Sequence, residues 1–191
     1  EMLHKVTEGE IGATLLARVA AVLSPQVVDL AVNPPPGVDF SGLDLPVVRD
    51  GTTTFEGPLA GVLAGLVHAS ALSPEPTHLL TTPVDLPFLP RDLADRLAAG
   101  LIVADTIAFA EGPAGRAPLC ALWPLSVAPR LEAFLAGGPE RRVGAFLAGE
   151  RTRGIPFAPV HVGGRAVDPF FNINTPDDLA FAEEMVGSLR P

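Results

Sequence analysis

The sequence has a single cysteine, Cys120, among its 191 residues. One cysteine excludes an internal disulfide framework and provides no metal-binding pattern of spaced cysteines. Because Cys120 lies in the apolar run of residues 118–123, we expect a buried side chain that packs as a small hydrophobic group. The histidines at 68, 78 and 161 also lack the spacing of metal ligands, so we expect them to be structural.

Basic residues are scarce as well. Thirteen lysines and arginines face 22 aspartates and glutamates, which leaves a formal net charge of −9. Proteins that bind nucleic acids carry clusters of lysine and arginine, so this composition argues against such partners. A small anionic ligand remains compatible with the composition, because backbone amides, one lysine and Mg²⁺ together can hold it.

Long apolar runs are absent. No stretch is long enough to span a bilayer, and the sequence does not open on a signal peptide. We therefore expect a cytoplasmic protein with no membrane partner.

The composition otherwise predicts one domain that spans residues 1–191, since 48 % of the residues are hydrophobic and can form a sizeable core. Short apolar runs predict strands, and apolar residues at helical spacing predict helices. The predicted strands cover residues 27–32, 45–49, 78–80, 103–110, 119–123 and 156–162. The predicted helices cover residues 13–23, 58–72, 91–99, 124–136 and 140–148, with a last one from residue 176. Their alternation predicts an α/β fold in three layers, with a mainly parallel sheet covered by helices on both faces.

Asp85 is the strongest candidate for a functional residue. It follows the predicted strand 78–80, and Pro83, Pro87 and Pro90 prevent that strand from continuing. Open α/β sheets bind ligands at the carboxyl ends of their strands, and Mg²⁺ is usually held by one or two carboxylates together with substrate phosphates. Asp85 is thus a candidate ligand for a Mg²⁺–nucleotide complex. The alternative is an ordinary turn or helix-capping aspartate beside proline.

Two further polar residues follow predicted strands. Asn33 ends residues 27–32 and Asp50 ends residues 45–49. Right-handed crossovers place the carboxyl ends of such strands along one edge of the sheet, so we expect Asn33, Asp50 and Asp85 to share a nucleotide site. Each could also be a plain turn residue. The glycine signatures of dinucleotide oxidoreductases and of P-loop NTPases are both absent, which removes support for those classes.

The last helix has the clearest local signal. Thr175 is a suitable N-cap, Pro176 occupies the first helical position, and two aspartates follow in the first turn. Just before the cap, Asn172 and Asn174 alternate along an extended segment and should point the same way. They could bind a polar ligand or could order the loop; the local sequence favours neither.

Taken together, these segments resemble the molybdenum cofactor guanylyltransferase family, and the resemblance covers essentially the whole chain in the right order. It is carried by residues 30–33 (Leu-Ala-Val-Asn), 46–50 (Pro-Val-Val-Arg-Asp), 57–61 (Gly-Pro-Leu-Ala-Gly), 83–90 (Pro-Val-Asp-Leu-Pro-Phe-Leu-Pro), 140–143 (Glu-Arg-Arg-Val) and 171–179 (Phe-Asn-Ile-Asn-Thr-Pro-Asp-Asp-Leu). The resemblance implies a Rossmann-like nucleotidyltransferase that transfers GMP from GTP to molybdopterin with Mg²⁺ as cofactor. Molybdoenzymes or other cofactor-biosynthesis proteins are further expected partners.

The resemblance also implies roles for individual residues. Asn33 and Asp50 would bind GTP, and Asp85 would bind Mg²⁺ and, through it, the triphosphate. Lys5 matches the lysine that closes the family's N-terminal phosphate loop. Asn172 and Asn174 would help to hold molybdopterin.

The beginning of the sequence departs from the family pattern. Of the family's first strand and glycine-rich loop only residues 2–5 (Met-Leu-His-Lys) have a counterpart, so we expect this signature to be missing or truncated here. Two alternatives therefore stay open. One is a related cytidylyltransferase or sugar-phosphate nucleotidyltransferase, and the other is a degenerate, non-catalytic homologue.

Overall fold

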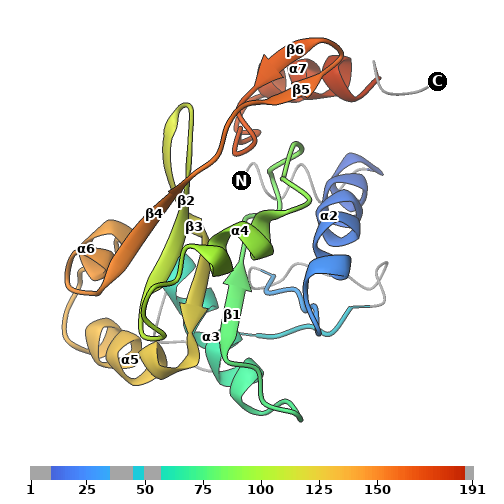
Figure 1. The fold of residues 1–191 in the computed structure, drawn as a ribbon. Helices are drawn as coiled ribbons and strands as arrows, with labels where there is room; N and C mark the ends of the chain where they lie inside the picture. The colour runs from blue at the N-terminus through green and yellow to red at the C-terminus, as the bar shows by residue number, and fades with distance from the viewer. Residues whose placement is uncertain (1–9, 35–44, 50–56, 188–191) are drawn as a thin grey trace.

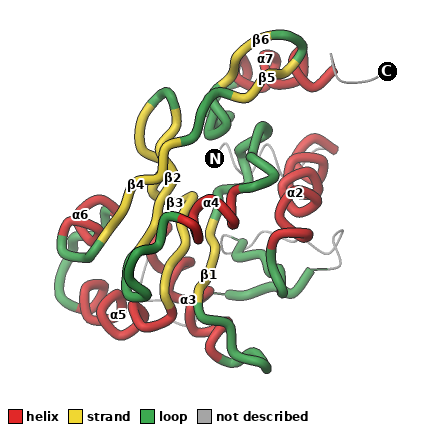
Figure 2. Tube along the Cα trace, in the orientation of Figure 1, coloured by secondary structure: helices red, strands yellow, loops and turns green. Residues whose placement is uncertain are grey.

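The computed structural model describes residues 10–34, 45–49 and 57–187 of the chain (Figure 1). Helices and strands alternate along most of this length, as expected for an α/β protein (Figure 2). The α-helices are α2 (Glu10–Leu23), α3 (Pro58–Ser70), α4 (Leu93–Ala99), α5 (Ala128–Ala136), α6 (Val143–Ala148) and α7 (Pro176–Gly187). The strands are β1 (His78–Thr81), β2 (Ile107–Gly112), β3 (Gly115–Pro124), β4 (Thr152–Pro156), β5 (Val160–Val162) and β6 (Arg165–Val167). Short 3₁₀ turns follow α2, at Ser24–Gln26, and precede α5, at Leu125–Val127.

The central sheet is mixed, with strand order β1-β3-β2-β4. β3 runs antiparallel to both of its neighbours, and only β2 and β4 pair in parallel. The prediction of a mainly parallel sheet is therefore wrong for the strand pairs that the structure describes. The physical reason is the tight turn at residues 113–114, which joins β2 and β3 into a hairpin and inserts β3 between β1 and β2.

Helices cover both faces of this sheet, because alternate residues of each strand point to opposite sides. On one face, buried residues of α2 and α4 belong to one cluster with strand residues Ala108, Ala110, Cys120, Leu122 and Ile155. On the other, α3, α5 and α6 pack against Ile107, Phe109, Ala121 and Trp123. Cys120 is 1 % exposed and belongs to the first of these clusters, so the prediction of a buried structural cysteine is confirmed.

The first two predicted strands form far less sheet than the sequence predicts. In the part of the chain that the structure describes, residues 27–32 and 45–49 share one isolated parallel bridge, between Val32 and Val47. The Val32 amide donates to the Pro46 carbonyl, and the Val48 amide donates to the Val32 carbonyl, both at 2.9 Å. A β-branched segment forms a strand only when a neighbouring strand pairs with it. The composition of residues 27–32 alone therefore did not suffice to predict a strand.

The C-terminal unit, defined here as β5, β6 and α7 (residues 160–187), lies beyond one end of the central sheet (Figure 1). Its core combines its own side chains with one from α2 and one from the loop after Asp85: Leu15, Phe88, Val162, Val167, Ile173, Ala182 and Met185. Strand β6 was not predicted. Gly163 and Gly164, both at positive φ, form the turn between β5 and β6, and a Gly-Gly pair is a hairpin signal that the sequence offers.

The N-terminus of α7 confirms the predicted cap. The Thr175 hydroxyl accepts a hydrogen bond from the Asp178 amide at 3.1 Å. In return the Asp178 carboxylate accepts from the amides of Thr175 at 2.8 Å and Asn174 at 3.0 Å. This reciprocal arrangement satisfies amides that a helix start leaves unpaired, and it fixes the course of the chain into α7. None of the helices in the described residues is long and apolar enough to cross a membrane.

Candidate functional site

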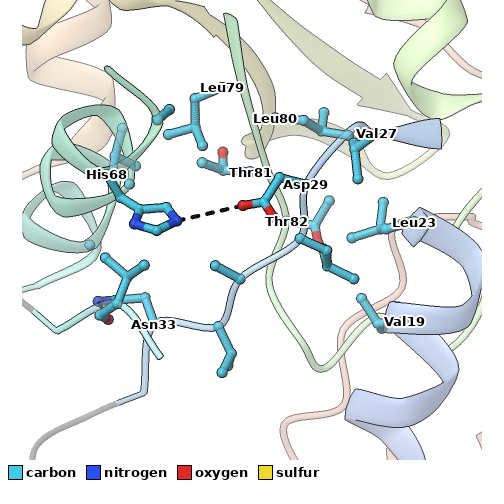
Figure 3. A pocket seen from close by; sticks show the side chains of 18 of the residues that line it. Val19, Leu23, Val27, Asp29, Asn33, His68, Leu79, Leu80, Thr81 and Thr82 are labelled. Atoms are coloured by element: carbon cyan, nitrogen blue, oxygen red, sulfur yellow. Dashed lines mark hydrogen bonds and ion pairs between the residues drawn. The ribbon is translucent and has the colours of Figure 1, made fainter. Parts of the chain in front are cut away.

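A cleft of about 560 Å³ separates β1 and α3 from the extended segment 27–32 (Figure 3). Its walls are mostly apolar and include Val19 and Leu23 from α2 and Leu79 and Leu80 from β1. The size falls within the range of small-molecule binding sites, which are usually apolar with a few polar groups that orient the ligand. The polar residues of this cleft are therefore the candidate ligand contacts.

Asn33 and Asp85 both line this cleft. The structure thus places both strand-end residues at one cleft, and their role in nucleotide binding stays a prediction. The third residue of that prediction, Asp50, and the predicted phosphate-loop residue Lys5 lie outside the described residues.

Asn33 is held by groups from two elements. Its side-chain amide donates to the Val48 carbonyl at 2.9 Å, which ties it to the neighbouring extended segment. On its other side, a Cβ added to Gly61 of α3 would collide with the Asn33 side-chain oxygen. The absence of a side chain at Gly61 is thus what lets Asn33 lie against α3.

Gly65, one helical turn further along α3, shows the packing function of such a glycine. A Cβ placed there would lie 2.9 Å from a methyl group of Leu79 on β1. Close packing of α3 on the sheet therefore explains the glycine at position 65. Gly61 instead accommodates a candidate site residue.

Asp29 and His68 form a second polar pair across the cleft, which the sequence did not predict. His68 Nε2 on α3 lies 3.5 Å from Asp29 Oδ2 on segment 27–32 (Figure 3). Both side chains are partly exposed, and the contact is an ion pair only when the imidazole is protonated. A histidine inside an apolar helix and an aspartate inside a β-branched run carry no sequence signal of being neighbours, so only the tertiary structure could show this pair.

Thr81 also lines the cleft, but its hydroxyl is already committed. It donates to the Leu119 carbonyl at 2.7 Å and accepts from the Trp123 indole nitrogen at 2.8 Å. Thr81 therefore belongs to the structural core of the sheet and is a weak candidate for a ligand contact.

Asp85 lies four residues beyond the end of β1 and is half-buried. Burial raises the pKa of its carboxyl group, while hydrogen bonds from its own backbone amide and from the Asn172 side chain act in the opposite direction. Its Oδ1 atom is buried without a hydrogen-bond partner. A buried carboxylate oxygen that lacks a donor is costly unless a ligand supplies the missing interaction, which makes Asp85 a suitable cation ligand.

Asn172 and Asn174 have different surroundings, although the sequence predicted that they would act together. The Asn172 side chain reaches the Asp85 carboxyl, and the amide of Ile173 donates to the Asp85 carbonyl at 3.1 Å. Asn174 is exposed, and its backbone amide is used by the α7 cap. The structure thus brings Asn172 to Asp85 and places Asn174 at the solvent-facing start of α7.

The residues around Asp85 offer oxygen ligands for a divalent cation. No cluster of three or more histidine, cysteine, aspartate or glutamate side chains occurs within the described ranges, so an all-protein cage for a transition metal is not found there. Magnesium needs less, because one or two carboxylates and substrate phosphates suffice. The unpartnered oxygens of Asp85 and Asn172 are hard ligands of the type that Mg²⁺ prefers, so the site fits this cation.

A second, more open concavity of about 630 Å³ lies at the start of α3, lined by Pro58 and residues 139–143. Here Arg142 forms a bidentate pair with Glu140, at 2.7 Å for its closest contact, and lowers the pKa of that carboxyl to about 2. Arg141 is bound to the Gly138 carbonyl. Two of the segments that carried the sequence resemblance, residues 57–61 and 140–143, are therefore neighbours in space.

Comparisons with known families and proteins agree with this picture. The family model described as the MobA-like NTP transferase domain matches residues 9–152. The chain is 42 % identical over 182 residues to the molybdenum cofactor guanylyltransferase of Sinorhizobium fredii, covering 94 % of this chain and 83 % of that protein. It is 43 % identical over 181 residues to the protein of the same name from Cereibacter sphaeroides, covering 92 % and 84 %.

Solved structures share the fold at lower identity. Molybdopterin-guanine dinucleotide biosynthesis protein A from Archaeoglobus fulgidus matches with a TM-score of 0.58 and 23 % identity, over 78 % of this chain and 72 % of that one. The 2-C-methyl-D-erythritol 4-phosphate cytidylyltransferase from Thermus thermophilus matches with a TM-score of 0.62 and 20 % identity, over 91 % and 89 %. At these identities the likeness shows a shared nucleotidyltransferase fold.

Proposed function

Because this chain belongs to the MobA-like NTP transferase family, we propose that it is a molybdenum cofactor guanylyltransferase. The reaction joins the GMP part of GTP to the phosphate of molybdopterin and releases pyrophosphate. Relatives that are 42–43 % identical over nearly the whole chain support this assignment. The structural observation that carries it is Asp85, half-buried with an unpartnered oxygen, on the cleft that Asn33 also lines.

In this proposal the nucleotide occupies the cleft beside β1. Its apolar walls accept the base. Asn33 offers its side-chain amide, which the hydrogen bond to the Val48 carbonyl and the absence of a side chain at Gly61 keep in place. Asp50 and Lys5, predicted for the nucleoside and phosphate parts of GTP, complete the nucleotide contacts as predictions from the sequence resemblance.

Asp85 is proposed to hold the Mg²⁺–triphosphate complex. When bound, Mg²⁺ would neutralise charge on the phosphates during transfer. The contribution of the chain is to place one carboxylate at the end of β1 and to keep one of its oxygens without an internal partner. A phosphate oxygen of molybdopterin then attacks the α-phosphorus of GTP in line, and the chain contributes by positioning the reactants and by the charge of Lys5.

Asn174, exposed just before α7, is the candidate contact for molybdopterin; the resemblance implies the same role for Asn172. We further propose one domain for residues 1–191, a cytoplasmic location, and other proteins of molybdenum cofactor biosynthesis or molybdoenzymes as partners. Each of these follows from the family resemblance and the composition.

The first experiment is thermal unfolding of the purified chain with excess GTP, CTP or ATP, each with and without Mg²⁺. A ligand at a hundred times its dissociation constant stabilises the folded state by about 2.7 kcal/mol, which is a visible shift. Stabilisation by Mg²⁺–GTP alone supports the guanylyltransferase. Stabilisation by Mg²⁺–CTP would move the chain to a related cytidylyltransferase, and no shift with any nucleotide would favour a non-catalytic homologue.

The second experiment is the Asp85→Asn variant. The asparagine keeps the size of the side chain and removes its charge, so GMP transfer should fall on the order of 10²–10³-fold, the scale expected when one preorganised electrostatic group is lost. Transfer at the wild-type rate would refute the assignment of Asp85.

A further inference from the structure

The contact between Asp85 and the C-terminal unit gives Asn172 a role that differs from the molybdopterin binding that the resemblance implies. Asn172 and Ile173 belong to the loop that leads into α7, almost ninety residues away from Asp85 in the sequence. Ile173 binds the backbone of Asp85 through its amide, and Asn172 binds the side chain of the same residue. Two consecutive residues thus hold both the backbone and the carboxyl group of Asp85.

The loop that carries this contact is itself held firmly. Ile173 is 5 % exposed and packs in the core of the C-terminal unit. Immediately after it, the reciprocal hydrogen bonds between Thr175 and Asp178 fix the start of α7. Phe88, three residues after Asp85, joins the same core and lies 6.1 Å from the ring of Phe171. Packing therefore restrains the loop on both sides of the Asp85 contact.

The side-chain oxygens of Asp85 and Asn172 show which atoms of this contact remain available to a ligand. Asp85 Oδ1 and Asn172 Oδ1 are both buried, and neither has a hydrogen-bond partner. An asparagine whose only task was to order the loop would have its amide oxygen paired, because unpaired buried acceptors are costly. The unpaired oxygens lie on the two residues that contact each other, which is the pattern expected beside a cation.

We propose that Asn172 is a positioning residue for Asp85, so that the C-terminal unit completes the cation site. The side chain of Asn172 and the Ile173 amide orient the carboxylate at the end of β1, and they do so through contacts that exist before any substrate binds. This inference rests on the proposed function, since it takes Asp85 as the cation ligand. It replaces the direct molybdopterin contact that the resemblance implies for Asn172.

Binding of Mn²⁺ to the full chain, followed by the electron paramagnetic resonance signal of the free ion, tests this inference without any turnover. Residues that hydrogen-bond a metal ligand typically contribute 10–100-fold to metal affinity, so Asn172→Ala should weaken Mn²⁺ binding by about that factor. Asn174→Ala is the matched control: it removes the same type of side chain two residues away, and Mn²⁺ affinity should stay within about twofold of wild type. Asp85→Asn should abolish saturable binding.

The outcomes separate this inference from the proposed function. Wild-type Mn²⁺ affinity in Asp85→Asn would overturn both. Lost affinity in Asp85→Asn with wild-type affinity in Asn172→Ala would overturn the positioning role alone. A raised KM for molybdopterin in Asn172→Ala, at unchanged Mn²⁺ affinity, would restore the direct substrate contact.

A thermal melt of each variant separates a loss of Mn²⁺ affinity from a general loss of stability. Asn172→Ala should melt within about 4 °C of wild type while its Mn²⁺ affinity falls. If the alanine variant melts lower than that, Asn172→Ser, which keeps a polar side chain, takes its place in the titration. Mn²⁺ affinity that follows the melting temperature from variant to variant would overturn the positioning role.

Discussion

The two edges of the central sheet are built differently. At one edge, β2 pairs with β4 over five residues, and β2 and β3 form a long hairpin. Beyond β1, at the other edge, the cleft begins, and segments 27–32 and 45–49 share a single bridge in the described residues. The first region is held by paired strands, with one register shift in the β2–β3 ladder between Phe109 and Ala110, and the second by scattered contacts.

The distribution of buried side chains follows the same division. The large side chains with least exposure include Trp123 on β3, Leu131 and Leu135 on α5, all on the ladder side of the molecule. The cleft side holds the polar candidates Asn33, Asp29 and His68, which are partly or fully exposed. Stability is thus concentrated in one region, and the groups that can meet a ligand are concentrated in the other.

The largest test of this division is Trp123→Ala. The indole is fully buried, stacks on Phe146 at 6.5 Å and donates to Thr81, so its removal creates a large cavity and leaves the hydroxyl without a donor. We expect a loss of about 3–5 kcal/mol of unfolding free energy in urea titrations. Val28→Ala is the control from the cleft side: Val28 is 92 % exposed, and its truncation should change stability by less than about 0.5 kcal/mol. Equal losses would show that the two regions do not differ as described.

Gly61→Ala probes the cleft side directly. The added methyl group would collide with the Asn33 side chain and displace it from the Val48 carbonyl. One hydrogen bond contributes about 1 kcal/mol, so we expect GTP affinity in calorimetric titrations to weaken roughly five- to tenfold. Gly144→Ala is the matched control, since Gly144 of α6 has no atom within 4 Å of an added Cβ. It should leave GTP affinity unchanged and stabilise its helix by about 0.5–1 kcal/mol.

Thr175→Ala extends the comparison to the C-terminal unit. Removing the hydroxyl leaves the Asp178 amide without its capping partner, and loss of such a cap typically costs about 1 kcal/mol. Chemical denaturation measures this loss of unfolding free energy. We expect it to be smaller than the loss in Trp123→Ala. A loss as large as that of the tryptophan variant would mean that the start of α7 supports the whole fold.

The smallest expected effect is the pH dependence of the same cap. The Thr175 side chain and the amides of Asn174 and Thr175 hold the pKa of Asp178 below its usual value of 3.8. A carboxylate whose pKa is lowered on folding stabilises the native state above its usual value, and this stabilisation is lost as the pH falls through the folded value. Asp178→Asn should therefore melt slightly below wild type at neutral pH, and the difference should vanish in acid. Asp177→Asn, which changes the neighbouring aspartate without touching these hydrogen bonds, is the matched control.

Elements with strong local chemistry were predictable. The α7 start rests on the Thr175 cap, both α7 and α3 have proline at the first helical position, and both starts agree with the sequence. The predicted strand at residues 103–110 begins instead at Ile107, and residues 27–32 form only one bridge. Strands depend on partners that are distant in the sequence, so their composition alone predicts them less well.

The candidate site divides in the same way. The sequence identified Asp85 and Asn33 because each follows an apolar run and precedes proline, and the structure brings both to one cleft. It did not predict the Asp29–His68 pair or the Asn172–Asp85 contact. Those contacts join residues whose local patterns are ordinary, and no spacing rule relates positions that lie so far apart in the sequence.

By itself, the sequence determined the α/β class, the identity of the candidate site residues and the starts of α3 and α7, because these depend on side-chain chemistry and on neighbours within a few positions. The tertiary structure alone decided the direction of β3, the lining of the cleft and the partner of each polar side chain. Backbone pairing and burial are set by contacts between distant segments, and those contacts exist only once the chain has folded.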